Sequence, residues 1–68
     1  MKYKLYKDGV IYSVSTSIMG LRAQCGFITG FPSNSNSIVT LCSELLNKGS
    51  HWVYYKGDKV LITLKEGE

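Results

Sequence analysis

Residues able to carry acid–base chemistry are few in this 68-residue chain. There is one histidine, His51, and of the five carboxylates Asp8 and Asp58 fall in predicted turns. Glu44 lies on the polar side of a predicted helix, and the other two carboxylates belong to a charged C-terminal tail. Acid–base catalysis needs partner groups within hydrogen-bond reach of one another or of a substrate. No such pairing is evident, so the sequence predicts a protein that is not an enzyme.

The two cysteines, Cys25 and Cys42, are too few and too far apart for a zinc site, which takes about four ligands in close pairs. We expect both to be buried thiols that behave as small apolar residues. A single disulfide between them is the alternative. The sequence predicts no metal site and no cofactor.

Aromatic and basic residues gather near the C-terminus. Trp52 and Tyr54 are two positions apart, so they share one face of a strand. Aromatic rings on a sheet with lysines nearby can stack single-stranded bases and neutralise their phosphates. One hypothesis is therefore binding of single-stranded nucleic acid or RNA through Trp52, Tyr54, Lys56, Lys59 and Lys65.

The centre of the chain is almost free of charge. Of eight basic and five acidic residues, only Arg22 and Glu44 lie within residues 10–47. Depletion of charge with aromatic residues retained is typical of the core of a protein–protein interface. An exposed Phe31 on a polar loop would offer an aromatic anchor. The leading hypothesis is thus a small non-enzymatic binding module whose partner is another protein or a second copy in a homodimer. The contacts are expected from Phe31, Asn34, Trp52 and Tyr54. In its small size and lack of recognisable motifs the chain resembles accessory, regulatory and inhibitor proteins of phages and mobile elements.

A third hypothesis rests on a local resemblance. Lys48-Gly49-Ser50-His51, followed by alternating residues and a hairpin through Leu64, is similar to the Gly-Ser-His start of a strand in HicA-type toxins. Those proteins are small ribonucleases with a fold like that of double-stranded-RNA-binding domains, so the resemblance implies that His51 is catalytic. It covers about the last third of the chain. The sequence departs from the family because a hairpin precedes the helix, no strand lies between helix and Gly-Ser-His, and no helix follows Leu64.

The elements that position these residues begin with a hairpin. Residues 3–6 and 10–18 alternate between apolar and polar types, and Asp8-Gly9 is a strong two-residue turn signal. Folding about this turn places Leu5 opposite Tyr12. It also places Tyr3 opposite Val14. The predicted core face therefore consists of Tyr3, Leu5, Val10, Tyr12, Val14 and Ile18.

Residues 21–31 are expected to form a third strand, since their apolar members fall on one parity: Leu21, Ala23, Cys25, Phe27 and Phe31. Gly26 and Gly30 indicate a bulge, an edge or a close backbone approach within it. We expect Phe27 to cap the helix and the sheet edge. From Ile38 the apolar spacing changes to that of a helix of about three turns, preceded by a Ser/Asn-rich loop and ended by Gly49, with one stripe of Ile38, Leu41, Cys42, Leu45 and Leu46.

Residues 51–55 and 60–64 predict a second hairpin. With Gly57-Asp58 as its loop, Val53 faces Ile62 and His51 faces Leu64. The opposite face then carries Trp52, Tyr54, Leu61, Thr63 and Lys65.

The predicted fold is a single α+β domain over residues 1–68. An antiparallel sheet of four to five strands, in the order ββ(β)αββ, is covered on one face by one helix. No apolar stretch reaches the length of a membrane span and no signal peptide is evident, so we expect a cytoplasmic protein. The net charge of +3 is mildly basic.

Overall fold

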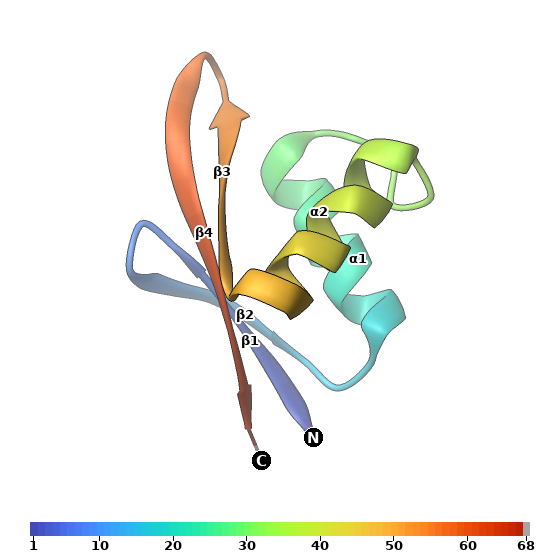
Figure 1. The fold of residues 1–68 in the computed structure, drawn as a ribbon. Coiled ribbons are helices and arrows are strands. Elements are labelled where there is room, and N and C mark those ends of the chain that lie inside the picture. The colour runs from blue at the N-terminus through green and yellow to red at the C-terminus, as the bar shows by residue number, and fades with distance from the viewer. Residues whose placement is uncertain (68) are drawn as a thin grey trace.

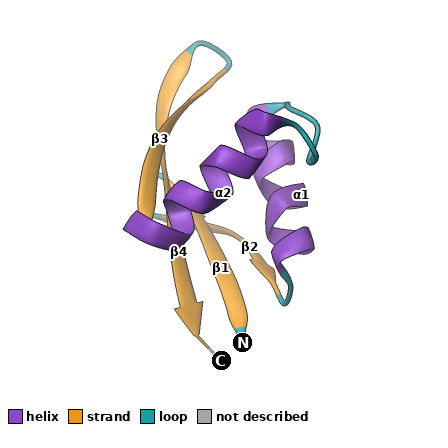
Figure 2. Ribbon diagram, turned by 45° about the vertical axis from the view of Figure 1, so that its right-hand side comes forward, coloured by secondary structure: helices purple, strands orange, loops and turns teal. Residues whose placement is uncertain are grey.

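The computed structural model describes residues 1–67, which form four strands and two helices in the order ββααββ. The strands pair as one antiparallel sheet with the order β2-β1-β4-β3. Both helices lie on the same face of this sheet, and the opposite face is open (Figures 1 and 2). The predicted α+β class is confirmed, with two helices where one was expected. The elements are β1 (Lys2–Lys7), β2 (Val10–Ser15), α1 (Ile18–Thr29), α2 (Asn36–Lys48), β3 (Ser50–Tyr55) and β4 (Asp58–Gly67).

The expected third strand over residues 21–31 is wrong, because α1 occupies most of that segment. Its buried residues, Leu21, Cys25 and Ile28, are spaced by four and three positions, which places them on one helical face. The side chain of Ser17 caps the helix by accepting a hydrogen bond from the Gly20 amide at 3.0 Å. Apolar residues at odd positions also fit a strand, so periodicity over this short segment did not distinguish the two structures.

Gly26 lets the loop after α1 fold back against the helix. A Cβ atom at this position would lie 2.8 Å from the carbonyl oxygen of Phe31, which is closer than real Cβ atoms approach. Gly30 ends the helix in the left-handed conformation, and its amide donates to the Gly26 carbonyl. The close backbone approach indicated by these glycines is therefore present, although within a helical hairpin.

The predicted helix after the Ser/Asn-rich loop is confirmed as α2. Ser35 caps it by accepting a hydrogen bond from the Ile38 amide at 3.3 Å, and Gly49 closes it in the left-handed conformation. Four of the five predicted stripe residues are buried: Ile38, Leu41, Cys42 and Leu45. Leu46 is exposed.

The first hairpin turns at Asp8-Gly9 as predicted, but a β-bulge changes its register. Lys7 pairs with Val10 and Tyr6 with Ile11, whereas beyond the register shift Leu5 pairs with Ser13. One extra residue in β2 reverses which side chains point toward the core. The predicted core position Val14 lies beyond the bulge and is therefore exposed, while Ser15 is buried; Tyr12 is the unpaired bulge residue and is exposed too. Val10 keeps its predicted pairing with Lys7 but is exposed as well, so its prediction as a core residue is wrong.

The second hairpin has a different register from the predicted one. Its loop is Lys56-Gly57, both at positive φ, so Val53 faces Val60 and His51 faces Ile62. The pairing slides by two residues relative to the prediction. Because side chains alternate with a period of two, each one stays on its predicted face.

One hydrophobic cluster joins the helices to the sheet. Its buried members come from both helices and the two central strands: Leu5, Leu21, Cys25, Ile28, Ile38, Leu41, Cys42, Leu45, Val60, Ile62 and Leu64. Tyr3, Val53 and Tyr55 pack at its margin. Phe27 does not belong to it, since 70% of its surface is exposed, and the expectation that it caps the helix and the sheet edge is wrong. No helix among residues 1–67 is long and apolar enough to span a membrane.

Candidate functional site

The open face of the sheet carries the predicted aromatic pair. Leu5, Ile62 and Leu64 are buried beneath the helices, so their strand neighbours point to the opposite side. In β3 that side belongs to Trp52 and Tyr54, which are 53% and 72% exposed. The ring atoms of both residues are thus available to a ligand in solution.

Lysines stand beside the rings on this face. Lys59 Nζ lies 5.3 Å from the centre of the Trp52 ring, and Lys65 Nζ lies 5.2 Å from the centre of the Tyr6 ring. Both distances are within the range of cation–π attraction. Tyr6 was not among the predicted site residues. Its position on the open face follows from its alternation with Leu5, a signal that the sequence already contained.

Two lysines of the open face lie opposite each other on neighbouring strands. Lys4 of β1 is paired directly with Lys65 of β4. Like charges opposite one another in a sheet reduce its stability. A bound anion would relieve that repulsion. We name this surface, made of Lys4, Tyr6, Trp52, Tyr54, Lys59 and Lys65, the open-face cluster.

Lysines outnumber acidic side chains around the cluster. Within residues 1–67, the carboxylates on strands are Asp58 and Glu66, and both alternate with open-face residues. Asp8 lies in a turn and Glu44 lies on α2. The Oδ1 atom of Asp8 accepts a hydrogen bond from the amide of Leu61, the strand partner of Trp52, so this one carboxylate lies near the cluster and is outnumbered by its three lysines.

Lys56 is the one predicted nucleic-acid residue that lies apart from the cluster. It is in the β3–β4 turn, with its Nζ 5.3 Å from the centre of the Tyr55 ring. Lys7 Nζ lies over the same ring at 4.2 Å. Tyr55 alternates with Tyr54, so its ring is on the helix side of the sheet.

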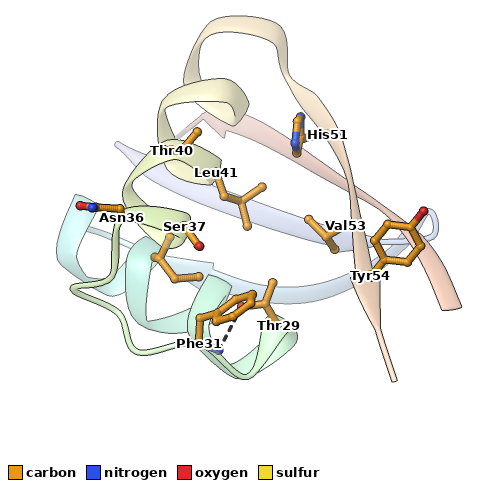
Figure 3. Close-up of a pocket in the computed structure, with 10 residues that line it drawn as sticks. Thr29, Phe31, Asn36, Ser37, Thr40, Leu41, His51, Val53 and Tyr54 are labelled. Atoms are coloured by element: carbon orange, nitrogen blue, oxygen red, sulfur yellow. Dashed lines mark hydrogen bonds between the residues drawn. The ribbon is translucent and has the colours of Figure 1, made fainter. Parts of the chain in front are cut away.

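A groove of about 560 Å³ separates the outer strand β3 from the helices (Figure 3). His51 and Val53 line it from β3, and Leu41 and Thr40 face them from α2. Phe31 closes one end and remains 51% exposed. The remaining lining residues are uncharged as well: Thr29, Asn36, Ser37, Ile38 and Tyr54. We call this the edge groove.

The predicted partner-binding residues are thus divided among three places. Phe31 lines the edge groove, and Trp52 belongs to the open face. Tyr54 lines the groove but points its ring away from α2 (Figure 3). Asn34 is exposed in the loop between the helices and lines neither surface. Phe31 also borders a second, smaller hollow with Phe27 on the outside of α1.

His51, the residue of the ribonuclease hypothesis, lies half-buried in the edge groove. It acts electrostatically on the carboxylate of Glu44. A hydrogen bond from Lys48, at 2.9 Å, and the charge of that lysine hold the pKa of Glu44 below its usual range, with a further contribution from His51. Glu44 is therefore an ionised partner of Lys48. A HicA-like ribonuclease activity at His51 stays a prediction, and it is checked by RNA cleavage by the purified chain and by its His51→Ala variant.

Both cysteines are free thiols buried between α1 and α2. Burial, with the adjacent Cys42, raises the pKa of the Cys25 thiol to about 12. Burial also raises the pKa of Cys42. Since the thiolate is the reactive form, these residues are not nucleophiles at neutral pH. No group of three or more His, Cys, Asp or Glu side chains within residues 1–67 could hold a metal ion.

Comparisons with protein-family models, with curated proteins and with solved structures found no match to this chain.

Proposed function

We propose that this chain binds single-stranded nucleic acid through the open-face cluster. The observation that carries the proposal is the exposure of Trp52 and Tyr54 on the helix-free face, beside lysines. Rings in this setting stack on bases of any sequence, and the lysines contact the phosphates. The directly opposed Lys4 and Lys65 add a reason for the surface to favour an anion.

Lysine-based recognition predicts how selective the binding is. Arg22 is the one arginine of the chain, and it lies on α1 rather than on the open face. Bidentate arginine contacts are the commonest way to read base edges. We therefore expect weak dependence on base sequence and a clear preference for single strands, whose bases are free to stack, over duplexes.

The test uses Trp52, the only tryptophan, as its own reporter. A short single-stranded RNA or DNA should quench its fluorescence, and duplex of the same sequence should compete poorly. Trp52→Ala, followed by fluorescence polarisation of labelled RNA, should weaken binding by about 5- to 150-fold, which corresponds to roughly 1–3 kcal/mol for one stacked base.

Salt dependence separates phosphate contacts from stacking. For a single strand, log K falls with log salt, and each phosphate contact contributes about 0.7 to the steepness of that slope. The double variant Lys59→Gln/Lys65→Gln should thus lower the slope by roughly 1.4. Lys48→Gln is the matched control, because Lys48 pairs with Glu44 on α2. Absence of quenching at low salt, or an equal effect of Lys48→Gln, would contradict the proposal.

Protein binding is the second candidate, and the edge groove is the observation that favours it. The groove is uncharged, and it runs beside β3, which is the last strand of the sheet. Phe31 stands half-exposed at its end as an aromatic anchor. Phe31→Asp should abolish an association made there while leaving nucleic-acid binding on the opposite face unchanged.

A further inference from the structure

Strand β3 presents an unprotected edge. It pairs with β4 on one side and, among the described strands, has no neighbour on the other. Tyr55 and Asp58 close the two-residue turn as a hydrogen-bonded pair, and such pairs alternate along an antiparallel ladder. The backbone N–H and C=O groups of Trp52 and Tyr54 therefore point away from β4. They can accept an additional strand.

The usual protections of an edge are missing from β3. Natural sheets shield their edges with lysine, proline or bulges. The other edge strand, β2, is interrupted by a bulge. By contrast, β3 has the sequence SHWVYY, without charge or proline, and pairs with β4 over six residues without a shift.

The edge groove lies directly beside this edge. A strand added to β3 would direct alternate side chains toward the helix side, over the space between Val53 and Leu41. Since the groove has no charged lining residue, the occupant must present uncharged side chains there. Apolar or aromatic groups at alternate positions would fill the space best.

We propose that the occupant is a second copy of this chain, paired antiparallel through β3. The inference names a partner for the second candidate function and rests on it, while it is independent of nucleic-acid binding. An antiparallel copy of β3 supplies uncharged residues to the groove, namely His51, Val53 and Tyr55. Strand β1, in contrast, carries lysines on both faces, and β4 carries lysines on the open face and the carboxylates Asp58 and Glu66 on the other.

Charge and symmetry both favour this pairing. Two copies with a net charge of +3 repel each other least when they meet through uncharged surface, and β3 with its groove is such a surface. Contact of β3 with β3 is isologous, so it closes at a dimer and does not grow into a fibre. The additional buried surface also supports a chain whose own core is small.

Pairing would enlarge the open-face cluster. The two sheets would join into one of eight strands, with Trp52 and Tyr54 of both copies at its centre and the lysines on either side. A single strand of nucleic acid could then cross both copies.

The experiment measures mass by sedimentation equilibrium from low to high micromolar concentration, without nucleic acid. We expect the mass to rise from that of one chain to that of two. His51→Lys places a charge in the edge groove at a half-buried polar position and should reduce the association constant at least tenfold. Phe27→Lys adds the same charge at an exposed site on the outside of α1 and should leave the association unchanged. Circular dichroism confirms that both variants fold.

Each outcome decides the proposal. A monomer at the highest concentration overturns it and leaves the groove for a different protein. Equal dissociation by Phe27→Lys also overturns it, because the contact would then lie on α1. Fluorescence quenching of Trp52 by RNA, recorded on the same protein after RNA is added, reports separately on the nucleic-acid proposal. A monomer whose fluorescence is quenched refutes dimerisation alone. A dimer whose fluorescence is not quenched refutes nucleic-acid binding alone.

Discussion

Single residues in this chain often have two functions in the structure, and Gly26 is a clear case. It lies within α1, where glycine lowers helix stability by about 1 kcal/mol relative to alanine. The structure nevertheless needs glycine there, since the carbonyl oxygen of Phe31 occupies the place of a side chain. The contact holds the loop that presents Phe31 beside the edge groove.

Gly26→Ala should therefore destabilise the protein by roughly 1–3 kcal/mol, despite the better helix propensity of alanine, because the loop must move away. Urea unfolding followed by circular dichroism measures the change. Gly20→Ala is the comparison within the same helix, since its nearest contacts are side-chain atoms of Ser15 and Ser17 at 3.3 Å. A gain in stability for Gly26→Ala would show that the loop does not rest on the helix.

At the scale of elements, a contact between Asp8 and Leu61 joins the two hairpins, and the sequence gives no local sign of it. Asp8 occupies the turn after β1 at a φ of 51°. Its amide donates to the Leu61 carbonyl at 2.9 Å, and its Oδ1 accepts from the Leu61 amide at 3.1 Å. The residue therefore extends the β1–β4 pairing beyond Lys7 as well as forming the turn.

Asp8→Ala should reduce stability by about 1–2 kcal/mol, because alanine loses the acceptor and tolerates the left-handed conformation poorly. Asp8→Asn keeps a side-chain acceptor and tolerates the left-handed conformation, so its loss of stability should be less than half that of Asp8→Ala. Thermal unfolding of the two variants beside the unchanged protein provides the measurement. Equal losses for alanine and asparagine would indicate that the charge, rather than the acceptor, stabilises the turn.

The same scale shows why the fold was only partly predictable. The α2 helix has a stripe, a cap and a terminal glycine that agree, so its position was evident from residues 35–49. The α1 segment contains two glycines and apolar residues that suit either a helix or a strand. The bulge in β2 depends on which residues the helices cover, and no local signal marks it.

For the whole molecule, the buried thiols link stability to pH. An unfolded cysteine loses its proton at about pH 8.5, whereas burial raises the pKa of Cys25 to about 12 and raises that of Cys42. Above about pH 8.5 the unfolded chain thus releases protons that the folded chain retains. The thiols contribute their full stabilisation below that pH and lose it progressively above it.

We expect the free energy of unfolding, measured by urea titration, to fall as pH rises from 8 to 10, by up to roughly 1.4 kcal/mol per pH unit for each affected thiol. Cys25→Ala removes one thiol and should flatten the dependence, although its stability at pH 7 is lower because of the small cavity. Comparing the two curves cancels the titration of lysines and tyrosines. Parallel curves would show that Cys25 does not carry the effect.

The candidate surfaces follow the same division between local and tertiary information. Alternation within β3 and β4 was sufficient to place Trp52, Tyr54 and Lys65 on one face, and a two-residue error in register left that grouping intact. Which face the helices cover depends on the whole core, so the exposure of Trp52 could not be derived from the strand itself. Tyr6 joined the cluster through the pairing of β1 with β4, which are separated by about the whole chain.

The sequence by itself determined the α+β class, the Asp8-Gly9 turn, the α2 helix and the faces of the last hairpin, because each depends on neighbours within a few residues. Only the tertiary structure decided that residues 18–29 are helical, that β2 is bulged and that β3 is an open edge beside a groove. Those features arise from contacts between distant segments. Burial of Leu21, Cys25 and Ile28 against the sheet selects the helix, and the order of the strands leaves β3 outermost.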